Sequence, residues 1–130
     1  MKNTKVVAAI IIYNGHILAT QRGYGDFSSK WEFPGGKVET NENPEEALIR
    51  EIKEELNADI TINEFLTTVE YDYPKFHLIM DCYVCSIVED KITLLEHKAS
   101  KWLAKNELDT VDWLAADVKV VEELKEYLCR

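Results

Sequence analysis

Carboxylates are concentrated in one stretch of the chain, residues 36–58. This stretch holds seven glutamates against one arginine and two lysines, so it carries nearly half of the formal net charge of −9 of the 130-residue chain. Glu51, Glu54 and Glu55 are spaced by three and four residues, which places them on one side of a helix. Grouped carboxylates can bind a cation or transfer protons, so this stretch is the first candidate for chemistry.

The helix implied by this spacing would bring the carboxylates to the edge of the core. At about 100° per residue, the three glutamates form a stripe about 100° wide. An apolar stripe, made of Leu48, Ile49, Ile52 and Leu56, lies directly beside it. Like charges this close repel each other, and a hard divalent cation would relieve the repulsion. We therefore expect Mg²⁺, with Mn²⁺ able to substitute; the alternative is an acidic helix face that is merely solvated.

Both ends of this helix have recognisable signals. Asn43 is placed as the N-cap, Pro44 as the first helical residue and Glu46 as the third, which together predict a capping box. Asn57 tolerates the left-handed conformation that ends many helices. The sequence thus predicts a capped helix over residues 44–56.

The rest of the chain reads mostly as strands. Asn14-Gly15, between the apolar runs 6–12 and 16–21, predicts a tight hairpin. A polar loop at 22–30 and a short strand at 31–33, stopped by Pro34-Gly35-Gly36, follow. Later extended stretches cover 65–73, 76–88 and 99–103, with 92–95 as a candidate for one more.

A second amphipathic helix is predicted near the end of the chain. Val118, Val121, Leu124 and Leu128 recur at helical spacing within residues 116–128. This helix would cover the face of the sheet opposite the first helix. The prediction is an α+β fold, an α/β/α sandwich with a central mixed β-sheet, formed by a single domain over residues 1–130.

Composition and charge exclude several classes of protein. An acidic chain offers no overall basic field for a nucleic-acid polymer or an anionic membrane surface. No segment is long and apolar enough to span a membrane. The three cysteines, an odd number without a secretory signal, favour reduced thiols in the cytoplasm. Cys82 and Cys85 match C-x-x-C, but on a strand they face opposite sides, so we expect packed thiols.

The acidic stretch also matches a known motif. Gly36, Glu42 and the run from Arg50 to Glu55 (REIKEE) fit the Nudix box, G-x5-E-x7-R-E-U-x-E-E-x-G-U with U aliphatic, through its last glutamate. The chain therefore resembles the Nudix hydrolases. It departs from the box at Asn57 and Ala58, which stand for a glycine and an aliphatic residue; because Asn tolerates the helix-ending conformation, we expect at most a small loss of stability.

Further segments resemble the MutT-like branch of this family, which includes 8-oxo-dGTP diphosphatases and CTP pyrophosphohydrolases. They are Gln21-Arg22, the run 30–39 (KWEFPGGKVE), Glu96-His97 and residues 113–124. The resemblance implies the Nudix fold and hydrolysis of a nucleoside triphosphate, such as CTP, dCTP or 8-oxo-dGTP, to the monophosphate and pyrophosphate. It implies a small-molecule partner, with water attacking a phosphorus held between divalent ions. The protein is expected to be a monomer or a homodimer, with either cleansing of the nucleotide pool or turnover of pyrimidine triphosphates as its role.

The resemblance also assigns the metal-binding and catalytic residues. The metal ligands would be the Gly35 carbonyl and the carboxylates of Glu51, Glu54, Glu55 and Glu96. Glu51 is the first candidate to deprotonate or orient the attacking water. Arg50 would pair with a box glutamate and orient it, and Glu42 would steady the preceding loop. The alternative for Glu96 is an ordinary exposed glutamate.

Residues that contact the substrate are expected outside the box. Arg22, and secondarily Lys37, are candidates for phosphate binding. Asp117 matches the position from which relatives recognise the base; its carboxylate could accept from a guanine-type base or from cytosine, or it could simply belong to the helix start. Tyr73, Phe76 and Phe33 are expected along the nucleotide, although Phe76 stands where relatives have an arginine, and Phe33 could equally pack in the core.

Two other functions remain open from the sequence. The box specifies a diphosphate but not what is attached to it, so a nucleotide sugar or a dinucleoside polyphosphate is an alternative substrate. A non-catalytic module that binds a nucleotide as a signal is the other alternative. The intact Glu51, Glu54 and Glu55 argue against that module, because a pure binder has no need of the whole carboxylate cluster.

Overall fold

The computed structural model describes residues 2–89 and 91–130. Within these residues a seven-stranded sheet comprises β1 (Lys2–Tyr13), β2 (His16–Arg22), β3 (Trp31–Glu32), β4 (Gly35–Lys37), β5 (Thr61–Tyr73), β6 (Phe76–Ser86) and β7 (His97–Ala104). The helices are α1 (Pro44–Leu56), α2 (Ala115–Leu128) and the short 3-10 helix η1 (Lys105–Thr110). None of the described helices is long and apolar enough to cross a membrane.

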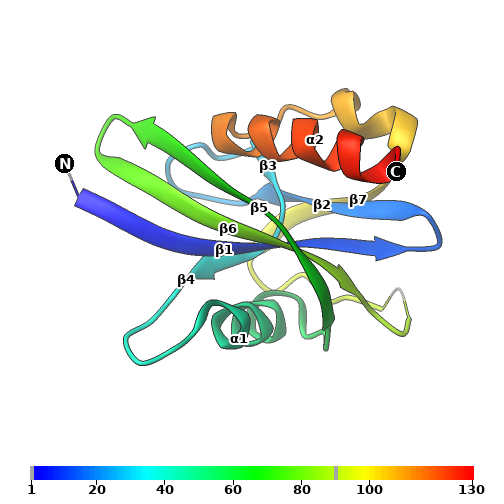
Figure 1. Cartoon of the computed structure of the whole chain (residues 1–130), viewed down its shortest axis with the longest axis horizontal. Coiled ribbons are helices and arrows are strands. Elements are labelled where there is room, and N and C mark those ends of the chain that lie inside the picture. The colour runs from blue at the N-terminus through cyan, green and yellow to red at the C-terminus, as the bar shows by residue number, and fades with distance from the viewer. Residues whose placement is uncertain (1, 90) are drawn as a thin grey trace.

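The sheet is mixed, and a helix covers each of its faces. Strands run in the order β3-β2-β1-β6-β5, with β4 paired to β1 and β7 paired to β2. β1 and β6 are parallel, whereas the other pairs are antiparallel. α1 lies below the sheet and α2 above it in Figure 1. The predicted α/β/α sandwich around a mixed sheet is confirmed.

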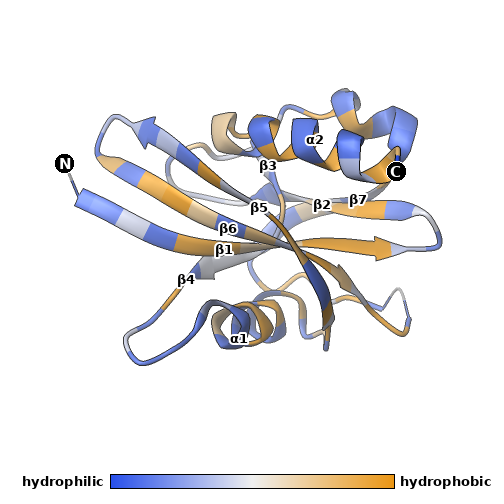
Figure 2. Ribbon diagram, in the orientation of Figure 1, coloured by the Kyte–Doolittle hydropathy of each residue, from blue (hydrophilic) through white to orange (hydrophobic). Residues whose placement is uncertain are grey.

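The central strand β1 supplies both halves of the core. Val7, Ala9 and Ile11 pack with α1, whereas Ala8 and Ile10 pack on the side of α2, because successive side chains of a strand point to opposite faces. Figure 2 shows this middle part of β1 as hydrophobic and its first residues as hydrophilic. The same alternation puts Cys82 in one core and Cys85 in the other, as predicted.

The capping signals of α1 are present as predicted. The Asn43 side chain accepts from the Glu46 N–H and the Glu46 carboxylate accepts from the Asn43 N–H. Asn57 ends the helix in the left-handed conformation, with φ of 51°. Asn14 and Gly15, both with positive φ, form the predicted hairpin turn between β1 and β2. These local signals set where α1 begins and ends, and so where its carboxylates lie.

Three predictions of detail are wrong, and one strand was not predicted. Residues 92–95 form no strand; Thr93 and Leu95 donate instead to the backbone carbonyls of Leu56 and Glu55. Gly35 and Gly36, predicted to stop a strand, belong to β4. Ile49 is 47% exposed, because it lies at the margin of the apolar stripe. Val118 is 45% exposed.

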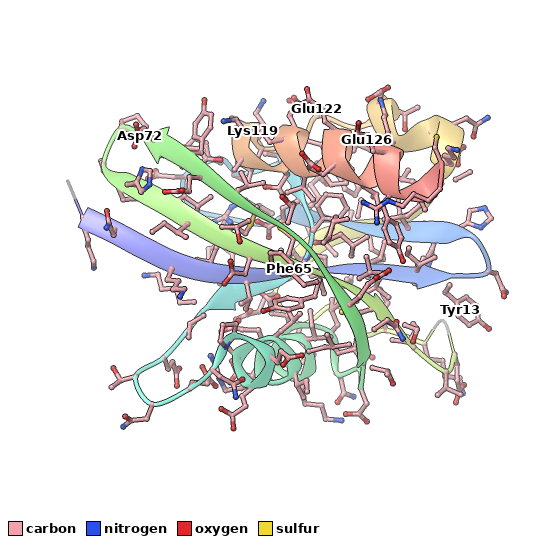
Figure 3. The ribbon with its side chains drawn as sticks, viewed as in Figure 1. Tyr13, Phe65, Asp72, Lys119, Glu122 and Glu126 are labelled. Carbon is pink, nitrogen blue, oxygen red and sulfur yellow. The ribbon has the colours of Figure 1, made fainter. Side chains whose placement is uncertain are left out.

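Val118 is exposed because the buried face of α2 is centred elsewhere. This face consists of Ala116, Asp117, Val120, Val121 and Leu124. Figure 3 labels Lys119, Glu122 and Glu126 along α2, and all three are exposed. The register of α2 therefore turns Asp117, a polar residue, towards the interior.

Candidate active site

A cavity of about 480 Å³ opens between the sheet, α1 and the start of α2. Many of the predicted site residues line it: Arg22, Phe33, Gly35, Lys37, Glu55, Tyr73, Phe76 and Asp117. Arg50, Glu51, Glu54 and Glu96 do not line the cavity itself. Of these, Glu51 borders it, since its carboxylate lies directly against Gly36, which does line the cavity. The fold thus brings residues 95 positions apart in the chain, Arg22 and Asp117, to one cavity.

Arg50 connects the acidic residues of α1 and the loop before it. Its guanidinium donates to Glu42 (Nε–Oε2, 2.7 Å) and to Glu51 (Nη1–Oε1, 2.9 Å). It also reaches Glu54 at 3.3 Å and the Lys37 carbonyl oxygen at 3.0 Å. The hydrogen bond from Arg50 lowers the pKa of Glu42 to about 2. The predicted pairing of Arg50 with a box glutamate is present, and Glu42 also accepts from the Glu39 N–H, which steadies the loop.

Glu55 is the carboxylate of the box that faces the cavity. It accepts a hydrogen bond from the Gly35 N–H at 3.2 Å. Burial raises the pKa of Glu55 to about 9, and the charges of Glu32, Glu51 and Glu96 add to the effect. Burial likewise raises the pKa of Glu51, although Arg50 opposes this. The carboxylates therefore crowd one another without a sufficient counter-charge.

This donor set fits a hard divalent cation. It consists of carboxylate oxygens beside the two glycines of β4, and carboxylate oxygens are the ligands that Mg²⁺ and Mn²⁺ prefer. A cation would also relieve the repulsion that raises the pKa of Glu55. In the part of the chain that the structure describes, no three His, Cys, Asp or Glu side chains are already gathered as a ready-made metal site.

Glu96 lies near these carboxylates because of how its segment docks. The Thr93 and Leu95 N–H groups donate to the carbonyls of Leu56 and Glu55 at 2.8 and 3.0 Å, at the end of α1. Glu96 follows directly and is exposed. Its charge raises the pKa of both Glu51 and Glu55. The structure thus places the charge of Glu96 close enough to act on both Glu51 and Glu55.

Gly35 and Gly36 occupy positions where a side chain does not fit. A Cβ on Gly36 would overlap the Glu51 carboxylate, and a Cβ on Gly35 would overlap the Val7 carbonyl oxygen. Gly36→Ala should displace a flexible side chain, so we expect kcat to fall by about tenfold or more with a nearly unchanged Tm. Gly35→Ala should instead push β4 off β1 and lower the Tm by several degrees, for a loss of about 1–3 kcal/mol. Steady-state kinetics and thermal melts of both variants check this; full activity of Gly36→Ala would contradict the placement of Glu51.

The other end of the cavity is aromatic and contains Asp117. Asp117 is 4% exposed, and its Oδ2 accepts from the Phe33 N–H at 2.9 Å. Burial raises the pKa of Asp117 to about 8, against the effect of that hydrogen bond. Phe33 stacks on Trp113 with centroids 4.5 Å apart, so it both packs in the core and lines the cavity. Tyr73 and Phe76 stack at 5.2 Å, and the Tyr73 hydroxyl accepts from the Ala116 N–H.

Sequence reasoning missed several residues at the cavity or beside it, among them Glu32, His97 and Phe27. Glu32, which lines the cavity, accepts from Arg22 at 3.0 Å and from His97 at 3.1 Å. Glu32 lies within the run 30–39 that resembles the MutT-like branch, and this position could have marked it as a site residue. Its partners, Arg22 and His97, come from other strands. Phe27 packs on Tyr73 at 5.3 Å from a loop, with φ of 65°, and nothing in the sequence predicts that conformation.

Comparison with known proteins agrees with this arrangement. Residues 3–124 match the NUDIX domain. The 8-oxo-dGTP diphosphatase of Proteus vulgaris is 37% identical over 101 residues, covering 76% of this chain and 88% of the relative. The CTP pyrophosphohydrolase of Escherichia coli (strain K12) is 32% identical over 123 residues, covering 94% of this chain and 91% of the relative.

A solved structure agrees over nearly the whole length. The solution structure of the DNA mismatch repair protein MutT, a Nudix hydrolase from methicillin-resistant Staphylococcus aureus 252, matches with a TM-score of 0.77 and 38% identity. The match covers 98% of this chain and 99% of that protein. With its box glutamates on α1 beside the cavity, the chain belongs to the NUDIX domain family.

Proposed function

We propose that this protein is a metal-dependent nucleoside triphosphate pyrophosphohydrolase. It would hydrolyse a triphosphate such as CTP, dCTP or 8-oxo-dGTP to the nucleoside monophosphate and pyrophosphate. The observation that carries the proposal is a single cavity with Glu55 at its acidic end and Asp117 at its aromatic end. The names of the relatives, 8-oxo-dGTP diphosphatase and CTP pyrophosphohydrolase, support this class of substrate.

The acidic end is proposed to hold Mg²⁺, with Mn²⁺ able to substitute. Its ligands would be the carboxylates of Glu51, Glu54, Glu55 and Glu96 and the Gly35 carbonyl. A bound divalent cation supplies neutralisation of phosphate charge and a lowered pKa of bound water. Without it, the carboxylates would repel an approaching triphosphate. We therefore expect the dependence of activity on the cation to be nearly complete.

The chain's own residues would orient water and phosphate. Glu51 is held by Arg50 at 2.9 Å, which fixes the direction of its carboxylate. From there it would orient or deprotonate the attacking water. Arg22 and Lys37, both of which line the cavity, would bind phosphate oxygens. Water then adds to one phosphorus of the α–β bridge, and the bond from that phosphorus to the bridging oxygen breaks.

The aromatic end would hold the base. Tyr73, Phe76 and Phe33 offer apolar surface for it. Asp117 uses Oδ2 for the Phe33 N–H, so Oδ1 is the atom proposed to meet the base. N–H groups of a guanine-type base, or the N4 amine of cytosine, would donate to Oδ1; such donors favour the ionised carboxylate and so oppose the burial that raises the pKa of Asp117 to about 8. Base selectivity would therefore depend on Asp117.

Asp117→Ala is expected to raise KM about tenfold for the preferred nucleotide, with smaller effects on other nucleotides and on kcat, because it removes recognition and not chemistry. Asp117→Asn keeps an acceptor for the Phe33 N–H but offers an amide to the base, and so should shift base preference without unfolding the chain. Steady-state kinetics on several triphosphates check both variants. Equal effects of Asp117→Ala on every nucleotide would refute this role.

Product analysis on a substrate panel tests the proposed reaction. The panel contains CTP, dCTP, 5-methyl-dCTP, dGTP, 8-oxo-dGTP, ADP-ribose and diadenosine polyphosphates. Monophosphate and pyrophosphate from one triphosphate are expected. Activity on the diphosphate-linked compounds alone would overturn the choice of triphosphates, and thermal stabilisation by a nucleotide without turnover would favour a binding module.

We also propose that residues 1–130 form one hydrolase domain that works in the cytoplasm as a monomer or a homodimer. The match to the NUDIX domain over residues 3–124 supports the single domain. The free thiols of Cys82, Cys85 and Cys129 support a reducing compartment. Light scattering of the purified protein distinguishes the two oligomeric states.

A further inference from the structure

Three side chains form a connected group beside the cavity: Arg22 on β2, Glu32 on β3 and His97 on β7. Arg22 Nη1 donates to Glu32 Oε1 at 3.0 Å, and His97 Nε2 lies 3.1 Å from Glu32 Oε2. Since the carboxylate oxygen accepts, Nε2 must be the donor. Both oxygens of Glu32 are thus occupied by different residues.

This group holds two unpartnered polar atoms. Among residues 2–89 and 91–130, the buried side-chain nitrogens without a hydrogen-bond partner are Arg22 Nε and His97 Nδ1. The His97 side chain is 4% exposed. An unpartnered buried donor costs free energy, so an acceptor that reached this atom of Arg22 would stabilise the group.

An irregularity in the sheet aligns the group. The pairing of β2 with β7 shifts between Gln21 and Arg22, so that Arg22 lies opposite His97. Bulges of this kind redirect side chains beside active sites. Arg22 and Glu32 line the cavity, whereas His97 is not among the residues that line it. His97 can therefore affect a ligand in the cavity only through its neighbours.

The shared carboxylate determines how much of Arg22 is free. A guanidinium and a carboxylate readily form a two-pronged pair, with two parallel hydrogen bonds. Here His97 occupies Oε2, so Glu32 holds Arg22 through Nη1 alone; Nε is buried and unpartnered, whereas the Arg22 side chain as a whole stays 38% exposed. Without His97, Oε2 would be free to take a second Arg22 donor. The guanidinium would then be drawn towards Glu32 and away from the cavity.

We propose that His97 is a positioning residue: by occupying one oxygen of Glu32, it keeps the Arg22 guanidinium available for a phosphate of the substrate. The proposal rests on the proposed function, in which Arg22 binds phosphate. His97 itself touches neither the substrate nor the reacting atoms. Its contribution is to substrate binding and not to the chemical step.

The test compares His97→Leu, which removes the donor but keeps an apolar side chain of similar volume, with His97→Gln. The Gln amide nitrogen is the same number of bonds from Cα as His Nε2, so it can donate to Glu32. For the triphosphate substrate we expect His97→Leu to raise KM about tenfold, with less than about a twofold change in kcat, and His97→Gln to restore most of the affinity. His16→Leu, at the exposed hairpin turn, is the matched control and should leave both parameters unchanged.

A double-mutant comparison shows whether His97 acts through Arg22. In an Arg22→Ala background, His97→Leu should add nothing further to KM. If KM of the double variant rises by the product of the two single-variant effects, the two residues act independently and the proposal is overturned. A parallel loss of Tm and kcat at constant KM in both His97 variants would also overturn it, because it would indicate a merely structural role. If the leucine variant does not fold, His97→Asn, whose shorter side chain does not bring a donor to Glu32, replaces it.

The same experiment separates failure of this inference from failure of the proposed function. If Arg22→Ala raises KM but His97→Leu does not, only the positioning role is wrong. If Arg22→Ala leaves KM unchanged, the assignment of Arg22 to phosphate is wrong, and the role of His97 falls with it. Absence of turnover in the unmodified protein across the substrate panel would instead refute the proposed hydrolase.

Discussion

Glu55→Gln should lower kcat by about a thousandfold while the chain stays folded. Glutamine has the same shape, and its amide oxygen can still accept the Gly35 N–H that Glu55 accepts at 3.2 Å. The variant loses one negative charge at the proposed metal-binding end of the cavity. If the metal is held less well, several kcal/mol of charge stabilisation in the transition state are lost, which corresponds to about a thousandfold in kcat. Steady-state kinetics at saturating Mg²⁺ and triphosphate, with a thermal melt, check the result.

A matched control for Glu55→Gln lies on the same helix. Glu45→Gln removes the same charge at an exposed position in the first turn of α1. It should leave kcat and KM essentially unchanged. A folded Glu55→Gln variant with near-normal kcat would contradict the metal-binding assignment of Glu55.

The raised pKa of Glu55 also predicts how the free energy of unfolding depends on pH in the metal-free protein. This pKa is about 9 in the folded chain, against 4.5 for the ordinary group. Between these values the folded state keeps a proton that the unfolded state has lost, so stability falls as pH rises from about 4.5 to 9. Glu55→Gln should lose this dependence. Thermal melts in EDTA at a series of pH values measure it, and parallel curves for the two proteins would contradict it.

Arg50→Ala is expected to have the second-largest effect, a fall in kcat of about a hundredfold together with a lower Tm. Arg50 contacts Glu42, Glu51 and the Lys37 carbonyl, so its loss releases both the box carboxylates and the loop before α1. Arg50→Lys should recover little, because an ammonium group cannot reproduce the planar set of donors.

Lys53→Ala is the control for Arg50. Lys53 is exposed on the same helix and, among the residues that the structure describes, forms an ion pair only with Asp59, at 3.4 Å on the surface, so little change is expected. A second readout is acid stability. Arg50 holds the pKa of Glu42 at about 2, so Glu42 stabilises the fold above its ordinary pKa of 4.5, and this contribution is lost as pH falls towards 2. Arg50→Ala should weaken that acid dependence; full activity of Arg50→Lys would contradict the orienting role.

The parts of the fold that local signals determine were predictable. The capping box of Asn43 and Glu46 and the left-handed Asn57 bound α1, because side-chain hydrogen bonds within a few residues determine those ends. Alternation along a strand was enough to place Cys82 and Cys85 in opposite cores. The carboxylates of α1 were found for the same reason: they lie on one helix whose ends the sequence marks.

What depends on contacts between distant strands was not predictable. The Glu32 and His97 pair joins β3 to β7, and a shift in the β2–β7 pairing creates it. No spacing in the sequence encodes that shift. β4 was missed because glycines signal turns, whereas here their lack of side chains allows close approach to Val7 and Glu51. Ile49 and Val118 show that a helical stripe is uncertain at its margins, where neighbouring elements decide what is covered.

The central claim is that the cavity joins metal-bound diphosphate chemistry to recognition of a nucleotide. The most direct test measures pyrophosphate and phosphate released from the best triphosphate of the panel as Mg²⁺ is added to protein freed of metal by EDTA. We predict that pyrophosphate and the nucleoside monophosphate appear in equal amounts, only with the cation, and that Glu55→Gln abolishes nearly all of this release. Equal rates in EDTA, or release of inorganic phosphate from the γ position instead of pyrophosphate, would contradict the account.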